Sequence, residues 1–165
     1  DLSIFNEDSV QQIYICHVLE HINRNQILSL ILEWNRVLQK NGILRIAVPD
    51  FEKVLKIYQK DNDMSQIIGF LNGGQTDQYD FHFLNFDFEI LNDLLKACGF
   101  DNVERYDAFE FLGDKDDYSK CYLPHMDFEN GELMSLNIVC NKVSDVDINT
   151  IKLSDKLKKY LKIEN

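Results

Sequence analysis

The sequence predicts an α/β protein built around a mostly parallel sheet. The order of the elements leads to this prediction, and the length and composition indicate the number of domains. Short apolar runs that suit buried strands alternate with stretches whose apolar residues recur at helical spacing, in the order strand, helix, strand, helix over residues 10–60. This alternation is typical of parallel strands joined by crossover helices. The length of 165 residues and the 45% hydrophobic content suit one domain with a substantial core.

The first four elements can be placed from their apolar pattern. Residues 10–17 contain a short apolar run that suits a strand buried on both faces. Residues 25–38 show helical spacing, and we expect Asn41-Gly42 to end that helix. A second strand follows over residues 43–48, and the helical period resumes over 50–60. These elements make up the parallel core of the predicted sheet.

Beyond residue 60 the regular pattern is interrupted twice. Residues 61–86 and 109–131 lack a clear period, and long ordered loops of this kind are often functional. The elements predicted around them are a helix over 87–98 that ends at Gly99, a strand over 103–108 and a last strand over 133–141. We assign residues 1–142 to the domain and 143–165 to a polar tail with one short helix.

Charge and cysteine content exclude several classes of function. The net charge of −11 opposes binding to nucleic acid or to anionic membranes, since both depend on Lys and Arg. No apolar run approaches the roughly 18 residues that a membrane span requires. The four cysteines form no CxxC pair, so neither a disulfide framework nor a thiolate metal site is indicated. We expect a cytoplasmic protein with no membrane partner, no nucleic-acid partner and no bound metal.

Two stretches carry a family resemblance. Residues 9–54, which contain CHVLEH, NRVLQKNG and ILRIAVPD, resemble the second half of class I S-adenosylmethionine-dependent methyltransferases. In that family a strand ends in an HVLEH turn, and a helix ending in RVLKPGG precedes the next strand. Residues 81–107, FHFLNFDFEILNDLLKACGFDNVERYD, resemble the same family's His-containing loop, the helix after it and the sixth strand. The order and spacing of these motifs make the resemblance specific over most of residues 1–142.

The resemblance implies a Rossmann-like methyltransferase fold with a reversed last strand. It implies transfer of a methyl group from S-adenosylmethionine to a small-molecule or glycan-type acceptor. Cys16, His17 and Leu19 would lie beside the cofactor, where a parallel strand ends. Asp1-Leu2 matches the position at which the family's carboxylate accepts a hydrogen bond from the adenine amino group. The family's amino-terminal strands and glycine-rich turn are missing from the sequence, so we expect a partial domain.

The missing strands leave two interpretations open. Without the family's first strand, the strand over residues 10–17 would expose an apolar edge, which favours aggregation. We therefore expect either a longer chain or a segment exchanged between copies in a homo-oligomer. If the chain is complete, the alternative function is a non-catalytic binding or scaffold module with a methyltransferase fold.

The five residues from His17 to His21 permit a different interpretation. They spell HVLEH, which matches the HxxEH signature of a zinc metallopeptidase. That function requires His17 and His21 one turn apart on a regular helix, with Glu20 free to act as a base. We keep it as an alternative, although no residue further along the chain is marked as the third zinc ligand.

Several residues are candidates for work on the methyl acceptor. His82 is the first choice for a general base, because the family carries a His in this loop; the alternative is that His82 only braces the loop. Asp50 directly follows a strand, although an Asp before a helix is also a favoured N-cap. The remaining candidates share one loop and bring carboxylates, a phenol and an imidazole to it: Asp116, Asp117, Tyr118 and His125.

Overall fold

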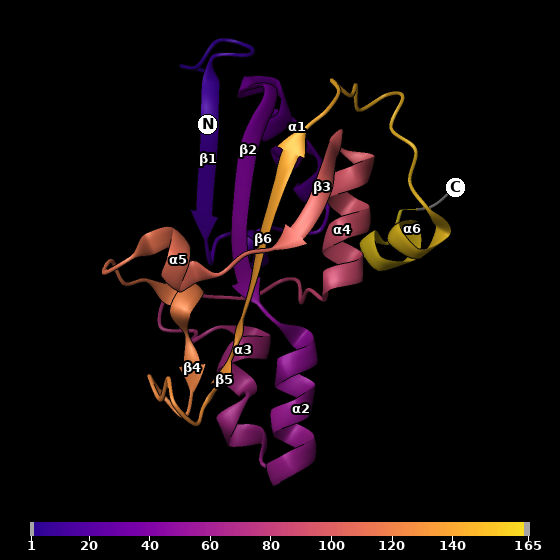
Figure 1. Cartoon of the computed structure of the whole chain (residues 1–165). Coiled ribbons are helices and arrows are strands. Elements are labelled where there is room, and N and C mark those ends of the chain that lie inside the picture. The colour runs from indigo at the N-terminus through magenta and orange to yellow at the C-terminus, as the bar shows by residue number, and fades with distance from the viewer. Residues whose placement is uncertain (1, 164–165) are drawn as a thin grey trace.

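The computed structural model describes residues 2–163 and contains the predicted α/β sheet. Its strands are β1 (Val10–Cys16), β2 (Leu38–Pro49), β3 (Phe100–Arg105) and β6 (Ser135–Lys142), in the order β1-β2-β6-β3. β1 runs parallel to β2, whereas β6 is antiparallel to both β2 and β3. The three earlier strands therefore share one direction and the last is reversed, which confirms the predicted sheet (Figure 1).

Two pairs of helices, α4 with α6 and α2 with α3, lie at different places around this sheet (Figure 1). α4 packs beside β3 with α6 against it, whereas α2 and α3 lie beyond the carboxyl ends of β1 and β2 together with the short strands. The remaining bounds are α1 (Ile27–Val37), α2 (Phe51–Asp61), α3 (Ile68–Asn72), α4 (Phe88–Ala97), α5 (Ala108–Leu112), α6 (Asp155–Leu161), β4 (Tyr122–Leu123), β5 (Glu132–Leu133), and the 3-10 turns η1 (Leu19–His21), η2 (Met64–Gln66) and η3 (Tyr118–Lys120). No helix among the described residues has both the length and the apolar character to cross a membrane.

One apolar cluster joins the sheet to α1, α4 and α6. β2 and β6 contribute fully buried side chains such as Leu44 and Leu136, and α4 contributes Leu91. Leu157 and Leu161 of α6 are also buried in this cluster. The tail helix therefore packs its apolar side chains on the core of the preceding residues.

Two predicted boundaries are wrong for related reasons. The helix α1 ends at Val37, and Asn41-Gly42 lies inside β2. The pairing of β1 with β2 is irregular there, because four residues of β2 lie opposite a single residue of β1 between two paired positions. Asn41 adopts φ 64 there, so the turn-forming pair makes a bulge and does not end the helix. β3 begins at Phe100, three residues before the predicted start, because Gly99 at φ 87 turns the chain directly from α4 into the strand.

Replacing Gly99 by alanine is expected to lower the free energy of unfolding by about 1–3 kcal/mol, because a left-handed backbone strains any residue with a Cβ. The added carbon would also overlap the carbonyl oxygen of Ser144 and come within 2.9 Å of Asn35 Nδ2. Gly69→Ala is the matched control, since nothing lies within 4 Å of its added Cβ in α3. Urea denaturation of both variants checks this expectation, and equal stabilities would contradict it.

Candidate functional site

A cavity of about 700 Å³ lies where β1 and β2 end. Cys16 closes β1, Pro49 closes β2, and both line this space together with His17, His82 and Tyr118. We call it the main cavity. The carboxyl ends of parallel strands are where doubly wound α/β folds bind their ligands. The sheet therefore presents its main cavity at the position expected for a ligand.

The conformation of His17 is set by the end of β1. Its backbone N–H donates to Ala47 O at 2.8 Å, and its φ of 50 turns the chain out of the strand. Its Nε2 lies 3.2 Å from Ser135 Oγ, and that hydroxyl donates to Asn137 Oδ1 at 3.0 Å. The imidazole is thus tied to β6 while it faces the main cavity.

The cofactor residues implied by the resemblance occupy three different places. Cys16 and His17 line the main cavity, as that role requires. Leu19 is fully buried in the apolar core. Leu2 lies before the amino end of β1, where its carbonyl accepts from Arg36 Nη2 at 3.3 Å, whereas His17 follows the carboxyl end of that strand. Asp1 lies outside the described residues.

The backbone around Glu20 does not have the geometry that the zinc metallopeptidase signature requires. Leu19–His21 forms a single 3-10 turn, and His17 precedes it in a left-handed conformation. His17 and His21 are therefore not presented one turn apart on a regular helix. The interpretation of HVLEH as a peptidase motif is wrong on this geometry.

The His82 ring is held by the backbone of α3. Its Nδ1 lies 2.9 Å from Phe70 O, and its backbone N–H donates to Asn72 O at 3.1 Å. A carbonyl oxygen can only accept, so Nδ1 carries the proton and Nε2 keeps its lone pair. His82 therefore lines the main cavity with one nitrogen fixed and the other available to accept a proton or to bind a ligand.

The acceptor candidates of the second loop gather around a smaller cavity of about 280 Å³, the loop cavity. Asp116, Asp117, Tyr118 and His125 all line it, and Tyr118 also lines the main cavity. Asp117 accepts from Tyr14 Oη at 2.6 Å and from Ser119 N at 2.9 Å. Burial alone would raise the pKa of Asp117, but the hydrogen bonds from Ser119 and Tyr14 outweigh burial and lower it.

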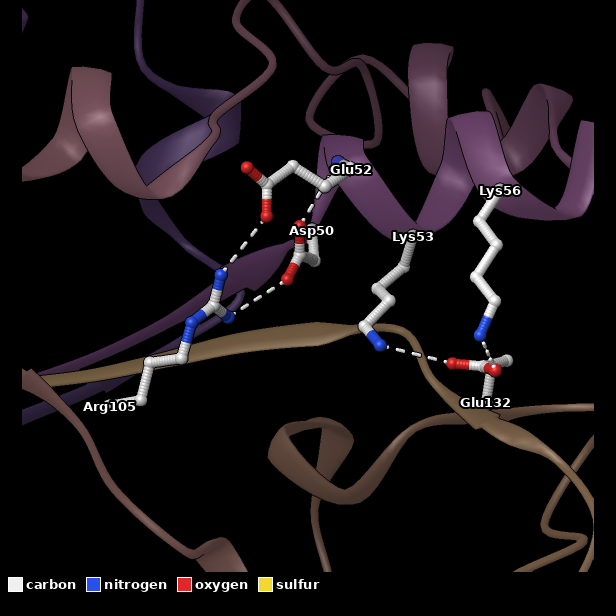
Figure 2. A network of polar contacts seen from close by, with 6 residues as sticks. All are labelled: Asp50, Glu52, Lys53, Lys56, Arg105 and Glu132. Carbon is white, nitrogen blue, oxygen red and sulfur yellow. Dashed lines mark hydrogen bonds and ion pairs between the residues drawn. The ribbon is translucent and has the colours of Figure 1, made fainter.

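Asp50 serves as the N-cap of α2 and is part of an ion-pair network. Its carboxylate accepts from Glu52 N at 3.0 Å and from Arg105 Nη1 at 3.0 Å (Figure 2). Arg105 also reaches Glu52, while Lys53 pairs with Glu132 at 3.0 Å further along the helix. The cap interpretation is confirmed. Asp50 is fully buried and is not among the residues that line either cavity.

Two variants of Asp50 separate the cap from the ion pair. Asp50→Asn keeps an oxygen for the Glu52 amide, so we expect it to cost only the half-exposed pair with Arg105, about 1 kcal/mol. Asp50→Ala also removes the cap, and the total rises to about 2 kcal/mol. Thermal and urea unfolding measure both values. A larger loss for Asn than for Ala would contradict the assignment.

Cys16 is expected to behave as an unreactive thiol. Burial is the main cause that raises its pKa to about 11; the hydrogen bond with Tyr14 opposes this, and the charge of Asp117 adds to it. At about pH 8 it should therefore hold on the order of 100-fold less thiolate than glutathione, whose thiol has an ordinary pKa. Alkylation by iodoacetamide, followed by peptide mass spectrometry, should still accelerate beyond about pH 9. A rate that levels off below that pH would contradict the assignment.

Sequence reasoning missed two residues of this region. Glu20 was considered only as part of the peptidase motif, yet it is a fully buried carboxylate beside His17. Ser135 was not singled out, although its hydroxyl contacts His17 across the end of the sheet. Neither residue carries a signal of its own in the sequence, because the contacts depend on how β6 and η1 meet.

Solved structures resemble this chain, although no family model matches it and no curated protein matches it. The DszA carbon methyltransferase is similar to this chain, with a TM-score of 0.51 and 15% sequence identity. The matched region covers 89% of this chain and 32% of the DszA carbon methyltransferase chain. A SAM-dependent methyltransferase from Archaeoglobus fulgidus has a TM-score of 0.50 at 14% identity, covering 86% of this chain and 63% of its own. A SAM-dependent methyltransferase from Methanosarcina mazei has a TM-score of 0.50 at 17% identity, and the match covers 84% of this chain and 62% of that protein's chain.

The chain has the fold of class I SAM-dependent methyltransferases. This confirms the fold that the resemblance implied. The chain spans about a third of the length of the first of these proteins and less than two thirds of the other two. At such low identity the likeness concerns the methyltransferase fold, and activity has to be argued from the site.

Proposed function

We propose that this methyltransferase-fold chain takes part in transferring a methyl group from S-adenosylmethionine to a small-molecule or glycan-type acceptor. The observation that carries the proposal is the main cavity at the carboxyl ends of β1 and β2. It is lined by Cys16 and His17 on the side of the sheet and by His82 on the side of the loops. A cytoplasmic location fits the four free cysteines, and a homo-oligomer is the proposed way to cover the open edge of β1.

The residues of the main cavity suit a cofactor that needs a polar and an apolar contact surface. Cys16 offers a protonated thiol, and the His17 imidazole is held between Ser135 and Glu20. When bound, S-adenosylmethionine supplies a methyl group on a sulfonium with a built-in leaving group. The protein's own task is to align the acceptor with that methyl group and to exclude water.

His82 is the proposed proton acceptor for a hydroxyl or amine substrate. Its Nε2 lone pair is available because Nδ1 donates to Phe70 O. Tyr118 lines both cavities, so an acceptor that occupies the loop cavity would meet the main cavity at this ring. Asp116, Asp117 and His125 then provide polar contacts to the acceptor, and the two carboxylates favour one with hydroxyl or amine donors.

Calorimetric titration with S-adenosylhomocysteine tests the proposal. We expect saturable one-to-one binding that weakens in His17→Ala, since this substitution removes an imidazole from the cavity wall. Lys96→Ala is the control, because Lys96 pairs with Asp101 on the surface beside β3 and should leave the affinity unchanged. A folded protein that does not bind S-adenosylhomocysteine would contradict the proposal and favour the non-catalytic module.

A further inference from the structure

A carboxylate and two imidazoles converge on one wall of the main cavity. Glu20, His21 and His82 each bring one ligand atom, and these atoms all lie within 4.8 Å of one another. The two rings meet edge to face with 4.8 Å between their centroids. The backbone supports this arrangement, since Phe83 N donates to Glu20 O at 2.8 Å and so joins the η1 turn to the loop that carries His82.

Both imidazoles are oriented in the same way. His21 Nδ1 lies 3.1 Å from Phe81 O, and His82 Nδ1 lies 2.9 Å from Phe70 O. Each carbonyl can only accept, so each Nδ1 carries a proton and each Nε2 keeps a lone pair. A metal-binding histidine commonly donates a hydrogen bond from its other ring nitrogen to a backbone carbonyl, which fixes the tautomer and the orientation of the ring.

The Glu20 carboxylate is buried without a hydrogen bond. The residue is fully buried, and neither Oε1 nor Oε2 has a hydrogen-bond partner among the described residues. Oε1 does lie 3.1 Å from His17 Nδ1, and this contact is an ion pair only when the imidazole is protonated. Burying a carboxylate without hydrogen bonds or a cation is costly. Glu20 therefore offers two oxygens that accept no hydrogen bond, beside a neutral or protonated His17, and a cation in the cavity would stabilise them.

We propose that Glu20, His21 and His82 bind a divalent transition-metal ion, with Zn²⁺ as the best match. Two imidazole nitrogens and one carboxylate oxygen suit Zn²⁺, whereas Ca²⁺ and Mg²⁺ prefer oxygen ligands. Bonds of about 2.0–2.2 Å require the three ligand atoms to move closer together than they lie here, by small side-chain rotations. Because all three residues line the main cavity, the fourth coordination position opens toward a ligand bound there.

This metal site differs from the peptidase motif in its geometry and its ligands. His17 is not a ligand, because its Nε2 contacts Ser135 and its Nδ1 faces Glu20. It borders the proposed site, with its Nδ1 3.1 Å from Glu20 Oε1. The third ligand, His82, comes from a distant loop and has no place in HxxEH.

The metal site also competes with the proton-accepting role of His82, because both use the same Nε2 lone pair. Zinc binding can nevertheless be measured without any methyl transfer, and S-adenosylhomocysteine binding can be measured without zinc. Failure of one proposal therefore leaves the other open to its own test.

Calorimetric titration of the chelator-treated protein with Zn²⁺ alone tests the inference. We expect one ion per chain. His21→Ala and His82→Ala should each weaken binding by more than the roughly 10- to 100-fold that follows removal of a ligand's hydrogen-bond partner. Glu20→Gln keeps the shape of the buried side chain and should weaken binding similarly. His125→Ala is the matched control, because this histidine lines the loop cavity and should leave the affinity unchanged.

Replacing Zn²⁺ by Co²⁺ tests whether a cysteine thiolate binds the ion instead, since Cys16 and Cys121 also line the main cavity. The Co²⁺ spectrum should show no thiolate charge-transfer band. The inference is overturned if the unmodified protein binds no Zn²⁺, if such a band appears, or if Glu20→Gln and both histidine variants keep the full affinity. Circular dichroism identifies any variant that fails to fold, and the folded ones among Glu20→Gln, His21→Ala and His82→Ala then decide the question.

Discussion

Phe86→Ala is expected to lower the free energy of unfolding by about 3–5 kcal/mol, a large part of the stability of a domain this size. Phe86 is fully buried in the main core cluster, and its ring centroid lies 6.4 Å from that of Tyr160 in α6. Its carbonyl also accepts from Phe51 N at the start of α2. Removing the ring leaves a void in the main core cluster, where it meets the tail helix.

Urea denaturation of Phe86→Ala and of Phe83→Ala measures this effect. Phe83 is the matched control, because it lies in the same loop with 48% of its surface exposed and should change stability by less than about 1 kcal/mol. Similar losses in the two variants would mean that the loop does not place Phe86 in the core. A large loss in Phe86→Ala alone would support the packing of α6 on this core.

If the proposed methyl transfer uses His82 as general base, His82→Ala is expected to reduce its rate about 10²- to 10⁴-fold, the usual contribution of such a base. The effect should appear in kcat, because His82 lies on the loop side of the main cavity and Cys16 and His17 on the sheet side. Binding of S-adenosylhomocysteine should be nearly unchanged. The assay follows S-adenosylhomocysteine formation with a panel of small hydroxyl and amine acceptors in metal-free buffer.

His82→Asn separates the proton-accepting role from a bracing role. Its side-chain amide can still donate to Phe70 O, as Nδ1 does at 2.9 Å, but it has no basic nitrogen. A general base predicts that Asn is as inactive as Ala, because the amide cannot accept the substrate's proton. Recovery of the wild-type rate in His82→Asn would show that His82 only holds the loop.

Much of the fold could be predicted because its signals are local. Apolar periodicity placed β1, β2, α1 and α4. The cap of α2 could also be predicted, because an Asp before a helix commonly accepts from the first backbone N–H groups, as Asp50 does from Glu52 N. Asn41-Gly42 misled the prediction because the same pair suits either a helix end or a bulge. The pairing of β1 with β2 decides between them, and that pairing depends on residues far apart in sequence.

The sequence predicted residues of the candidate site only where their position depends on the end of a single strand. Cys16 and His17 follow from the end of β1, and both line the main cavity. The meeting of Glu20 and His21 with His82 depends on the loop between α3 and α4, whose shape follows from backbone hydrogen bonds such as Phe83 N to Glu20 O. No sequence pattern predicts those hydrogen bonds, so the sequence analysis considered Glu20 only as part of the HxxEH motif.

The most direct test of the central claim is amide hydrogen exchange with and without S-adenosylhomocysteine. If the main cavity binds the methyl donor, exchange should slow at residues 16–21, where β1 ends, and around Pro49, where β2 ends. Residues 100–105 of β3 lie at the other edge of the sheet and should exchange as before. Protection elsewhere with none at the ends of β1 and β2, or no protection at all, would contradict the account.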